Sequence, residues 1–189
     1  MLTDILQKAM AGEQVTFWPA RGTNATLAAF NPNTGLVYLN AWHKARIMKF
    51  VEAKLNLGAG YTGVETTFTT PAGEPEGHHK AINPLTGKEV WSVPFHDAVN
   101  SAGMLATDGG LLFTGKLTGE VIALDIENGK QLWQFKTGSG INAAPITYTY
   151  KGVQYVTILS GIGGSNPRRF AGRLTAPGGS VWTFALMPE

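Results

Sequence analysis

Histidines with acidic neighbours are the first residues in this sequence whose types could do chemistry. His78 and His79 are adjacent in EPEGHH, where Glu74 and Glu76 supply two carboxylates. Imidazole and carboxylate groups bind metals, but adjacent side chains point in different directions, which suits a single metal ion poorly. We therefore interpret the two histidines as exposed loop residues.

Two other motifs have the residue types of a reactive site. His96 and Asp97 have the types of a base and its orienting carboxylate, but no Ser or Cys nucleophile is signalled nearby, so we interpret them as part of a loop. The glycines of TGSGIN and SGIGGS could suggest phosphate binding, which needs glycines between a strand and a helix. Strand-like sequence surrounds these glycines, so we interpret them as turns.

An internal repeat indicates the elements that must position these residues. AINPLTGKEVW (81–91) recurs as ALDIENGKQLW (123–133), and a third copy, AAFNPNTGLVYL (28–39), has Leu39 where the others have Trp. Each copy predicts a hairpin, because Asn or Asp can bond to the backbone two residues on and Gly takes the positive φ of a tight turn. Several strands per repeat of about 40–50 residues are typical of a β-propeller, in which the Trp packs between blades.

The remaining segments extend this pattern. Strands are predicted at 110–116, 119–125, 131–137, 145–161 (a hairpin that turns at Lys151-Gly152) and 179–186. TDILQKAMAG predicts a short helix, and 57–79 is expected to be a long loop between blades. We therefore expect an all-β, incomplete β-propeller of about four blades. Residues 1–189 should form a single domain, with 1–16 as a helix or tail.

The composition excludes several classes of protein. The 189 residues are 43% hydrophobic and 15% charged, and the net charge of +2 is too small to suggest nucleic-acid binding. Without cysteines there is neither a disulfide nor a thiolate metal site. No run approaches the ~20 apolar residues of a membrane span, and Met1 to Gln14 lacks the basic start and apolar core of a signal peptide.

The ordered series of motifs resembles a known family. FNPNTGLVYLNAW, AINPLTGKEVW, GGLLFTGKLTGEVIALDIENGKQLWQFKTGSG and APITYTYKGVQYVTILSGIGG are similar to the C-terminal part of pyrroloquinoline quinone (PQQ)-dependent alcohol dehydrogenases, the methanol and ethanol quinoproteins. The likeness runs from about Trp18 to Leu186. Its Gly-Lys-x-x-Trp phrases match the tryptophan-docking repeats of that family's eight-bladed propeller, so the resemblance implies about half of a propeller.

The resemblance also implies which residues face the cofactor. Asn24 matches an Asn that reaches the quinone, although Ala25 replaces the family's Trp, and Asn100 lies near the position of another Trp. Gly164 matches the family's Gly-Gly-Trp phrase, in which Ser165 replaces the Trp. The expected PQQ contacts are thus Asn24, Asn100, Gly164 and Ser165. By resemblance, the calcium ligands, the Asp base and the paired cysteines belong to the first half of the propeller, and no segment here matches them.

Two functions follow from these expectations. The chain is either the C-terminal portion of a PQQ-dependent dehydrogenase that oxidises alcohols to aldehydes, or an inactive half-propeller scaffold that assembles with another chain. The first implies PQQ, calcium held outside this chain, a cytochrome c-type electron acceptor and a periplasmic location. Either implies a partner, a second copy or a complementary half-propeller. No catalytic residue or metal ligand is expected in this chain.

Overall fold

The computed structural model describes residues 2–20, 22–23, 26–58, 62–97, 102–163 and 175–185. Its regular structure is one helix and fourteen strands in four sheets within these ranges. The chain divides into two compact units, one of Met1–Gly22 with His43–Glu74 and the other of Thr23–Trp42 with Pro75–Glu189.

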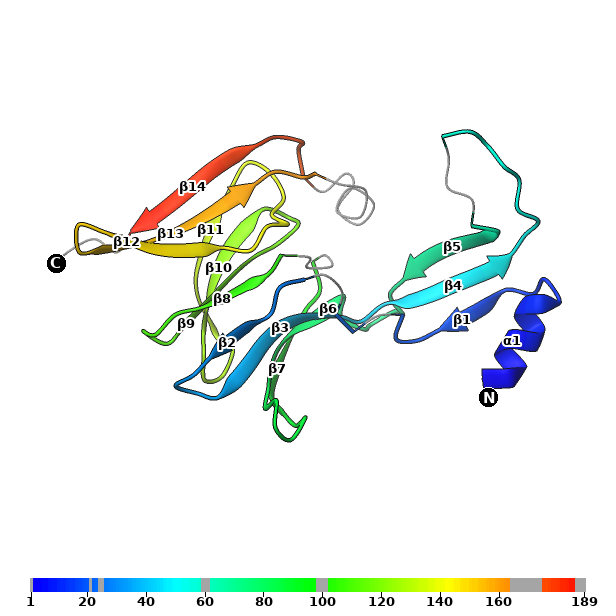
Figure 1. The fold of residues 1–189 in the computed structure, drawn as a ribbon, viewed down its shortest axis with the longest axis horizontal. Helices are drawn as coiled ribbons and strands as arrows, with labels where there is room; N and C mark the ends of the chain where they lie inside the picture. The colour runs from blue at the N-terminus through cyan, green and yellow to red at the C-terminus, as the bar shows by residue number, and fades with distance from the viewer. Residues whose placement is uncertain are drawn as a thin grey trace. The chain divides into compact units, whose positions relative to one another are not determined.

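The larger unit contains three antiparallel sheets, labelled in Figure 1. The first sheet is ordered β2 (Ala29–Asn31), β3 (Leu36–Trp42), β6 (Gly77–Ile82), β7 (Glu89–Phe95). The second is ordered β8 (Met104–Ala106), β9 (Leu111–Gly115), β10 (Glu120–Asp125), β11 (Gln131–Lys136). The third is ordered β12 (Ile146–Tyr150), β13 (Val153–Ser160), β14 (Ser180–Ala185), so within the described residues it has one strand fewer.

The repeated phrase builds the same hairpin, β6–β7 and β10–β11, in the first two sheets. Asn83 Oδ1 accepts the backbone N–H of Leu85 at 2.9 Å, and Asp125 Oδ1 accepts that of Glu127 at 2.8 Å. Each turn closes through a glycine with positive φ, +70° at Gly87 and +74° at Gly129.

The two tryptophans of the repeat occupy equivalent positions. Trp91 lies opposite Ala81 and Trp133 opposite Ala123, each next to a register shift. Both contact the following sheet: Trp91 Nε1 donates to the carbonyl oxygen of Ile126 at 3.1 Å, and the Trp133 ring meets Phe184 edge-on at 5.1 Å. The prediction of equivalent Trp positions in adjacent sheets is confirmed.

The third copy of the phrase has a different place in the fold. Asn31 and Gly35 form the same kind of turn, with Asn33 N–H donating to Asn31 Oδ1 at 2.8 Å and φ of +68° at Gly35. This turn joins β2 to β3, the first two strands of its sheet, whereas the Trp-containing copies join the last two strands of theirs. Leu39 is therefore not a substitute for Trp, because its strand lies one position further into the sheet.

Apolar faces join the three sheets in sequence. Between the first and second sheets, Tyr38 and Ala81 pack with Leu112, Ile122 and Leu124, all buried. Between the second and third, a separate cluster is formed by Ala102, Val121, Ile141 and Ile158, with Trp182 and Phe184 against it. These contacts stack the sheets face to face, as expected for consecutive propeller blades.

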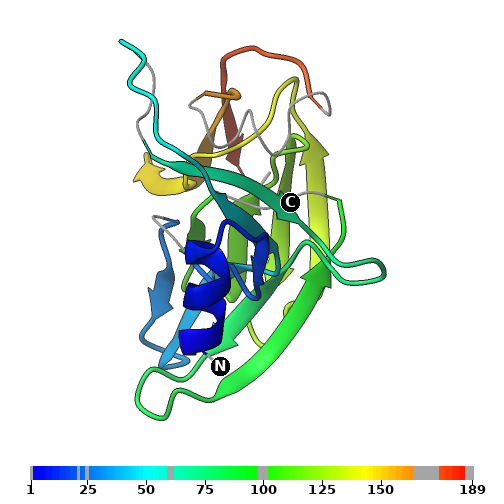
Figure 2. The ribbon, with the colours of Figure 1, turned by 90° about the vertical axis from the view of Figure 1, so that its right-hand side faces the viewer.

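The smaller unit has one three-stranded sheet and the helix. Its strands are ordered β1 (Val15–Phe17), β4 (Ala45–Phe50), β5 (Val64–Thr69), and α1 (Leu2–Met10), the blue helix of Figures 1 and 2, contacts β1 and β4. The expected N-terminal helix is thus present. The four sheets match the expected number, but this one is not built from the repeated phrase.

The expectation of a loop over 57–79 is wrong. β5 occupies Val64–Thr69, paired along β4, and β6 begins at Gly77. The alternation of VETTFT, with Val64, Thr66 and Phe68 less exposed than their neighbours, is a strand signal. The Gly- and Pro-rich residues on both sides obscured so short a pattern.

Replacing the equivalent turn glycines of the two Trp-containing copies with alanine should separate the cost of backbone strain from the cost of a clash between sheets. Gly87→Ala meets nothing within 4 Å and should cost about 1–2 kcal/mol for its left-handed backbone. A Cβ at Gly129 would lie 2.8 Å from the Trp91 ring, so Gly129→Ala should cost a further 1–3 kcal/mol or so. Urea unfolding measures both, and equal losses would contradict the packing of Trp91 against this turn.

Candidate functional site

The four residues expected to contact a quinone, Asn24, Asn100, Gly164 and Ser165, all lie outside the described residues, so that set stays a prediction. The described segments that follow Asn24 and Asn100 in the sequence nevertheless lie close to each other. Met104 N–H donates to the carbonyl oxygen of Leu27 at 3.0 Å, and Gly103 has room for no side chain against Leu27 and Ala144. Leu27 and Met104 therefore lie on adjacent segments.

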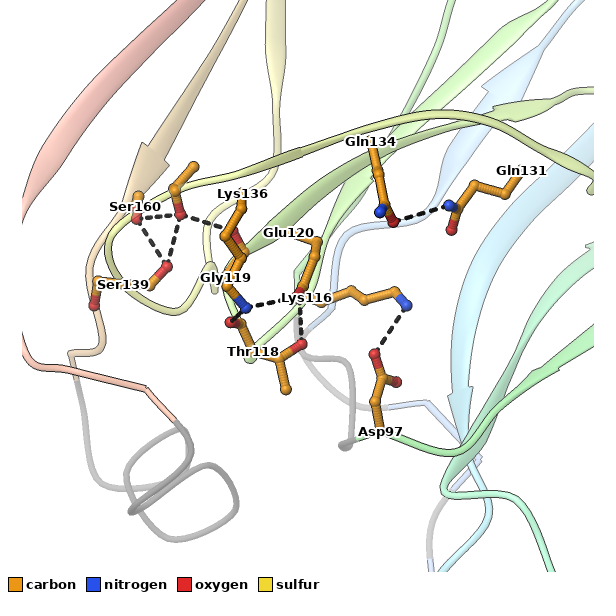
Figure 3. A network of polar contacts seen from close by, with 11 residues as sticks. Asp97, Lys116, Thr118, Gly119, Glu120, Gln131, Gln134, Lys136, Ser139 and Ser160 are labelled. Atoms are coloured by element: carbon orange, nitrogen blue, oxygen red, sulfur yellow. Dashed lines mark hydrogen bonds and ion pairs between the residues drawn. The ribbon is translucent and has the colours of Figure 1, made fainter.

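A cleft of about 420 Å³ opens between the first and second sheets. One wall is the end of β7 with His96 and Asp97, and the other is the β10–β11 turn from Asn128 to Gln131. Asp97 does not act as a lone carboxylate, because the Lys116 ammonium donates to it at 2.8 Å across the cleft (Figure 3).

His79 lies at the buried end of this cleft. Its ring is 3% exposed, packs on Phe95 at 4.8 Å between centroids, and places Nδ1 2.6 Å from Asn40 Oδ1. The Asn40 amide nitrogen donates to the carbonyl oxygen of Ala102 at 2.8 Å and to Thr114 Oγ1 at 3.1 Å. We refer to His79, Asn40 and Thr114 as the His79 network.

Burial decides the charge of this histidine. Desolvation, reinforced by the nearby Lys116 ammonium and opposed by Asp97, lowers the pKa of His79 to about 4. The imidazole is therefore neutral at neutral pH.

The interpretation of both histidines as exposed loop residues is wrong, since His78 is half-buried and His79 is buried. Both lie on β6, and the alternation of a strand turns His79 inward while His78 is less buried. Adjacent histidines do point apart, as expected. Among the described residues no group of three or more His, Asp or Glu side chains could hold a metal ion.

Hydroxyl groups cross the second interface between sheets. Ser160 Oγ lies 2.8 Å from Thr137 Oγ1 and 2.9 Å from the carbonyl oxygen of Ser139 (Figure 3). Gly161 N–H donates to the carbonyl oxygen of Gly140 at 2.8 Å, which joins the two glycine-rich segments. TGSGIN lies between β11 and β12, so its position between two strands is as expected for a turn.

Comparison with known proteins decides the family. A family model, PQQ_2, described as outer membrane protein assembly factor BamB, matches residues 75–158. A quinoprotein ethanol dehydrogenase of Pseudomonas aeruginosa is 37% identical over 171 residues, which cover 87% of this chain and 27% of that protein. A lanthanide-dependent methanol dehydrogenase of Methylacidiphilum fumariolicum is 38% identical over 147 residues, 76% of this chain and 24% of that protein.

The chain belongs to the family of quinoprotein alcohol dehydrogenases.

Solved structures agree with this family assignment. A europium-containing methanol dehydrogenase superposes with a TM-score of 0.77 at 32% identity, over 87% of this chain and 33% of that one. A quinohemoprotein alcohol dehydrogenase from Comamonas testosteroni gives 0.69 at 29% identity, over 89% and 27%. The incomplete β-propeller is therefore confirmed. The chain spans about a quarter of the length of the curated relatives it matches.

Within the residues that the structure describes, no helix is long and apolar enough to cross a lipid bilayer.

Acid should destabilise the chain through His79. Unfolding exposes the imidazole, whose ordinary pKa is 6.5, so between about pH 6.5 and about pH 4 the unfolded chain binds a proton that the folded chain does not. The free energy of unfolding should fall through this window by up to about 3 kcal/mol, with the full stability present above it.

Urea unfolding at pH 7, 5.5 and 4.5 measures this loss. His79→Gln should flatten the pH dependence, whereas His78→Gln, one residue away on the same strand, should leave it unchanged. A pH dependence that survives His79→Gln intact would contradict the assignment.

Proposed function

We propose that this chain is the C-terminal part of a PQQ-dependent alcohol dehydrogenase that oxidises alcohols to aldehydes, with this part contributing one side of the quinone pocket. The observation that carries the proposal is 37% identity to a quinoprotein ethanol dehydrogenase over 171 residues that make up only 27% of that protein. In such an enzyme the cofactor carries out the redox chemistry, while protein groups orient the substrate and supply the base.

The proposed pocket consists of Asn24, Asn100, Gly164 and Ser165. The hydrogen bond from Met104 to Leu27 supports it, because it brings together the segments that follow the first two of these residues. We further propose that the metal and the general base come from the rest of the propeller. Calcium was expected, but relatives include proteins named lanthanide-dependent and europium-containing methanol dehydrogenases, so either ion is a candidate.

Partners and location are proposed on the same basis. A relative in Thauera butanivorans is named 1-butanol dehydrogenase (cytochrome c), which supports a cytochrome c-type electron acceptor. We propose a periplasmic location and a small alcohol as substrate. The remaining portion of a propeller is the proposed structural partner, with a second copy of this chain as the alternative when that portion is absent.

The third sheet supports the need for a partner. One face of it packs on the second sheet, but the other has a row of large apolar side chains that are 45–67% exposed: Ile146, Tyr148, Tyr150, Leu159 and Val181. Exposed contiguous apolar faces of this kind mark interaction surfaces. A propeller blade has a neighbour on both faces, so we propose that another sheet covers this one.

The isolated chain should therefore show no alcohol-dependent dye reduction with PQQ and either calcium or a lanthanide. Activity should appear when it is combined with a quinoprotein ethanol dehydrogenase lacking the matching 171-residue segment. In that assembly Asn24→Ala should lower activity about tenfold, the value of a lost hydrogen bond to the cofactor. The control Asn56→Ala, at an exposed position, should not.

Turnover by the isolated chain would contradict the proposal directly. Assembly with the complementary portion without any activity would instead favour the inactive scaffold.

The exposed face of the third sheet should also make the isolated chain self-associate. Ile146→Lys places a charge on this face and should shift the chain toward monomer in sedimentation velocity. Thr149→Lys adds the same charge on the opposite face of β12, where the position is also exposed, and should not. A monomer at all concentrations before any substitution would argue against this surface as an interface.

A further inference from the structure

The His79 network has only one consistent arrangement of protons. The Asn40 nitrogen faces the carbonyl oxygen of Ala102, which can only accept, so the amide orientation is fixed and Oδ1 must face His79. The Thr114 hydroxyl donates to the carbonyl oxygen of Gly103 at 3.0 Å and so accepts from Asn40. His79 Nδ1 must therefore donate to Asn40 Oδ1.

This tautomer leaves Nε2 of His79 as a hydrogen-bond acceptor. No partner for Nε2 is present in the part of the chain that the structure describes, although the ring is 3% exposed. His79 lines the cleft between β7 and the β10–β11 turn, so its ring is a buried acceptor within reach of a ligand bound there. A buried acceptor without a partner has a cost, and a ligand that donates a hydrogen bond would remove it.

The other residues that line the cleft determine which kind of hydrogen-bond donor a ligand can carry. Its walls combine the apolar Val93, Pro94 and Leu124 with two lysines, Lys116 and Lys130. Asp97 is paired with Lys116 at 2.8 Å, whereas the exposed Lys130 has no ion-pair partner among the described residues. This excess positive charge would repel a ligand that donates through an ammonium group, whereas it would attract an anionic ligand that donates through a hydroxyl group.

We propose that this cleft binds a small hydroxylated anion, such as a short 2-hydroxy acid. The hydroxyl donates to His79 Nε2, the carbon atoms contact the apolar wall, and the carboxylate lies by Lys130. A volume of about 420 Å³ has room for such a molecule together with bridging waters. The inference depends on the His79 network and the residues that line this cleft, and it is independent of dehydrogenase activity.

Nitrogen NMR of the imidazoles tests the site in the 189-residue chain. The free chain should show His79 protonated at Nδ1 and unprotonated at Nε2 at pH 7. Glycolate should shift the Nε2 signal saturably, with a dissociation constant in the millimolar range for so few atoms. Acetate, which lacks the hydroxyl, should bind at least tenfold more weakly, as should ethylene glycol, which lacks the carboxylate.

Two exposed lysines, Lys130 and Lys136, provide a test variant and its matched control, because replacing either one leaves the core intact. Lys130→Ala should weaken glycolate binding about threefold to tenfold, whereas Lys136→Ala, paired with Glu120 elsewhere on the second sheet, should leave it unchanged. A proton on Nε2, no saturable shift, or equal affinity for glycolate and acetate would each overturn the proposal, the last because solvent would then be the partner of Nε2.

Discussion

The packing of one sheet face against the next is the interaction on which the rest of this structure depends. β10 shows it most clearly, because successive residues of this strand serve opposite interfaces: Ile122 and Leu124 pack on the first sheet, and Val121 packs toward the third. Its near-continuous burial contrasts with β12, where every residue is exposed. Each sheet in such a stack is stabilised mainly by its neighbours, so a sheet with one exposed apolar face should be less stable than one covered on both faces.

Polar groups buried inside these interfaces fix how neighbouring sheets align and orient the histidine that lines the cleft. Asn40 reaches from β3 to Ala102 and Thr114 of the second sheet, and the Ser160 hydroxyl reaches from β13 to Thr137. Buried polar groups are costly unless they are paired, so the sheets are held where these bonds can form. The same bonds hold the His79 imidazole in one tautomer, and its burial between the sheets keeps it neutral, which connects the stacking of sheets to the proposed binding site.

The features that the sequence predicts well are those encoded within a few residues. The Asn-x-x-Thr-Gly and Asp-x-x-Asn-Gly turns, the Lys151-Gly152 turn and the inter-sheet position of Trp91 follow from local side-chain chemistry and spacing. The burial of His79 could not be predicted, because it depends on contacts between residues far apart in the sequence. Asn40 is 39 residues from His79 and 74 residues from Thr114. The sequence does not predict β5, because neither β5 nor its pairing partner β4 contains a copy of the repeat that would identify it as a strand.

Amide hydrogen exchange on the isolated chain tests most directly whether neighbouring sheets supply the stability. The second sheet is covered on both faces and the third on one, so β9 and β10 should exchange at least tenfold more slowly than β13 and β14. Equal or greater protection in the third sheet would contradict the account, since it would mean that a sheet with one open face is as stable as one enclosed on both sides.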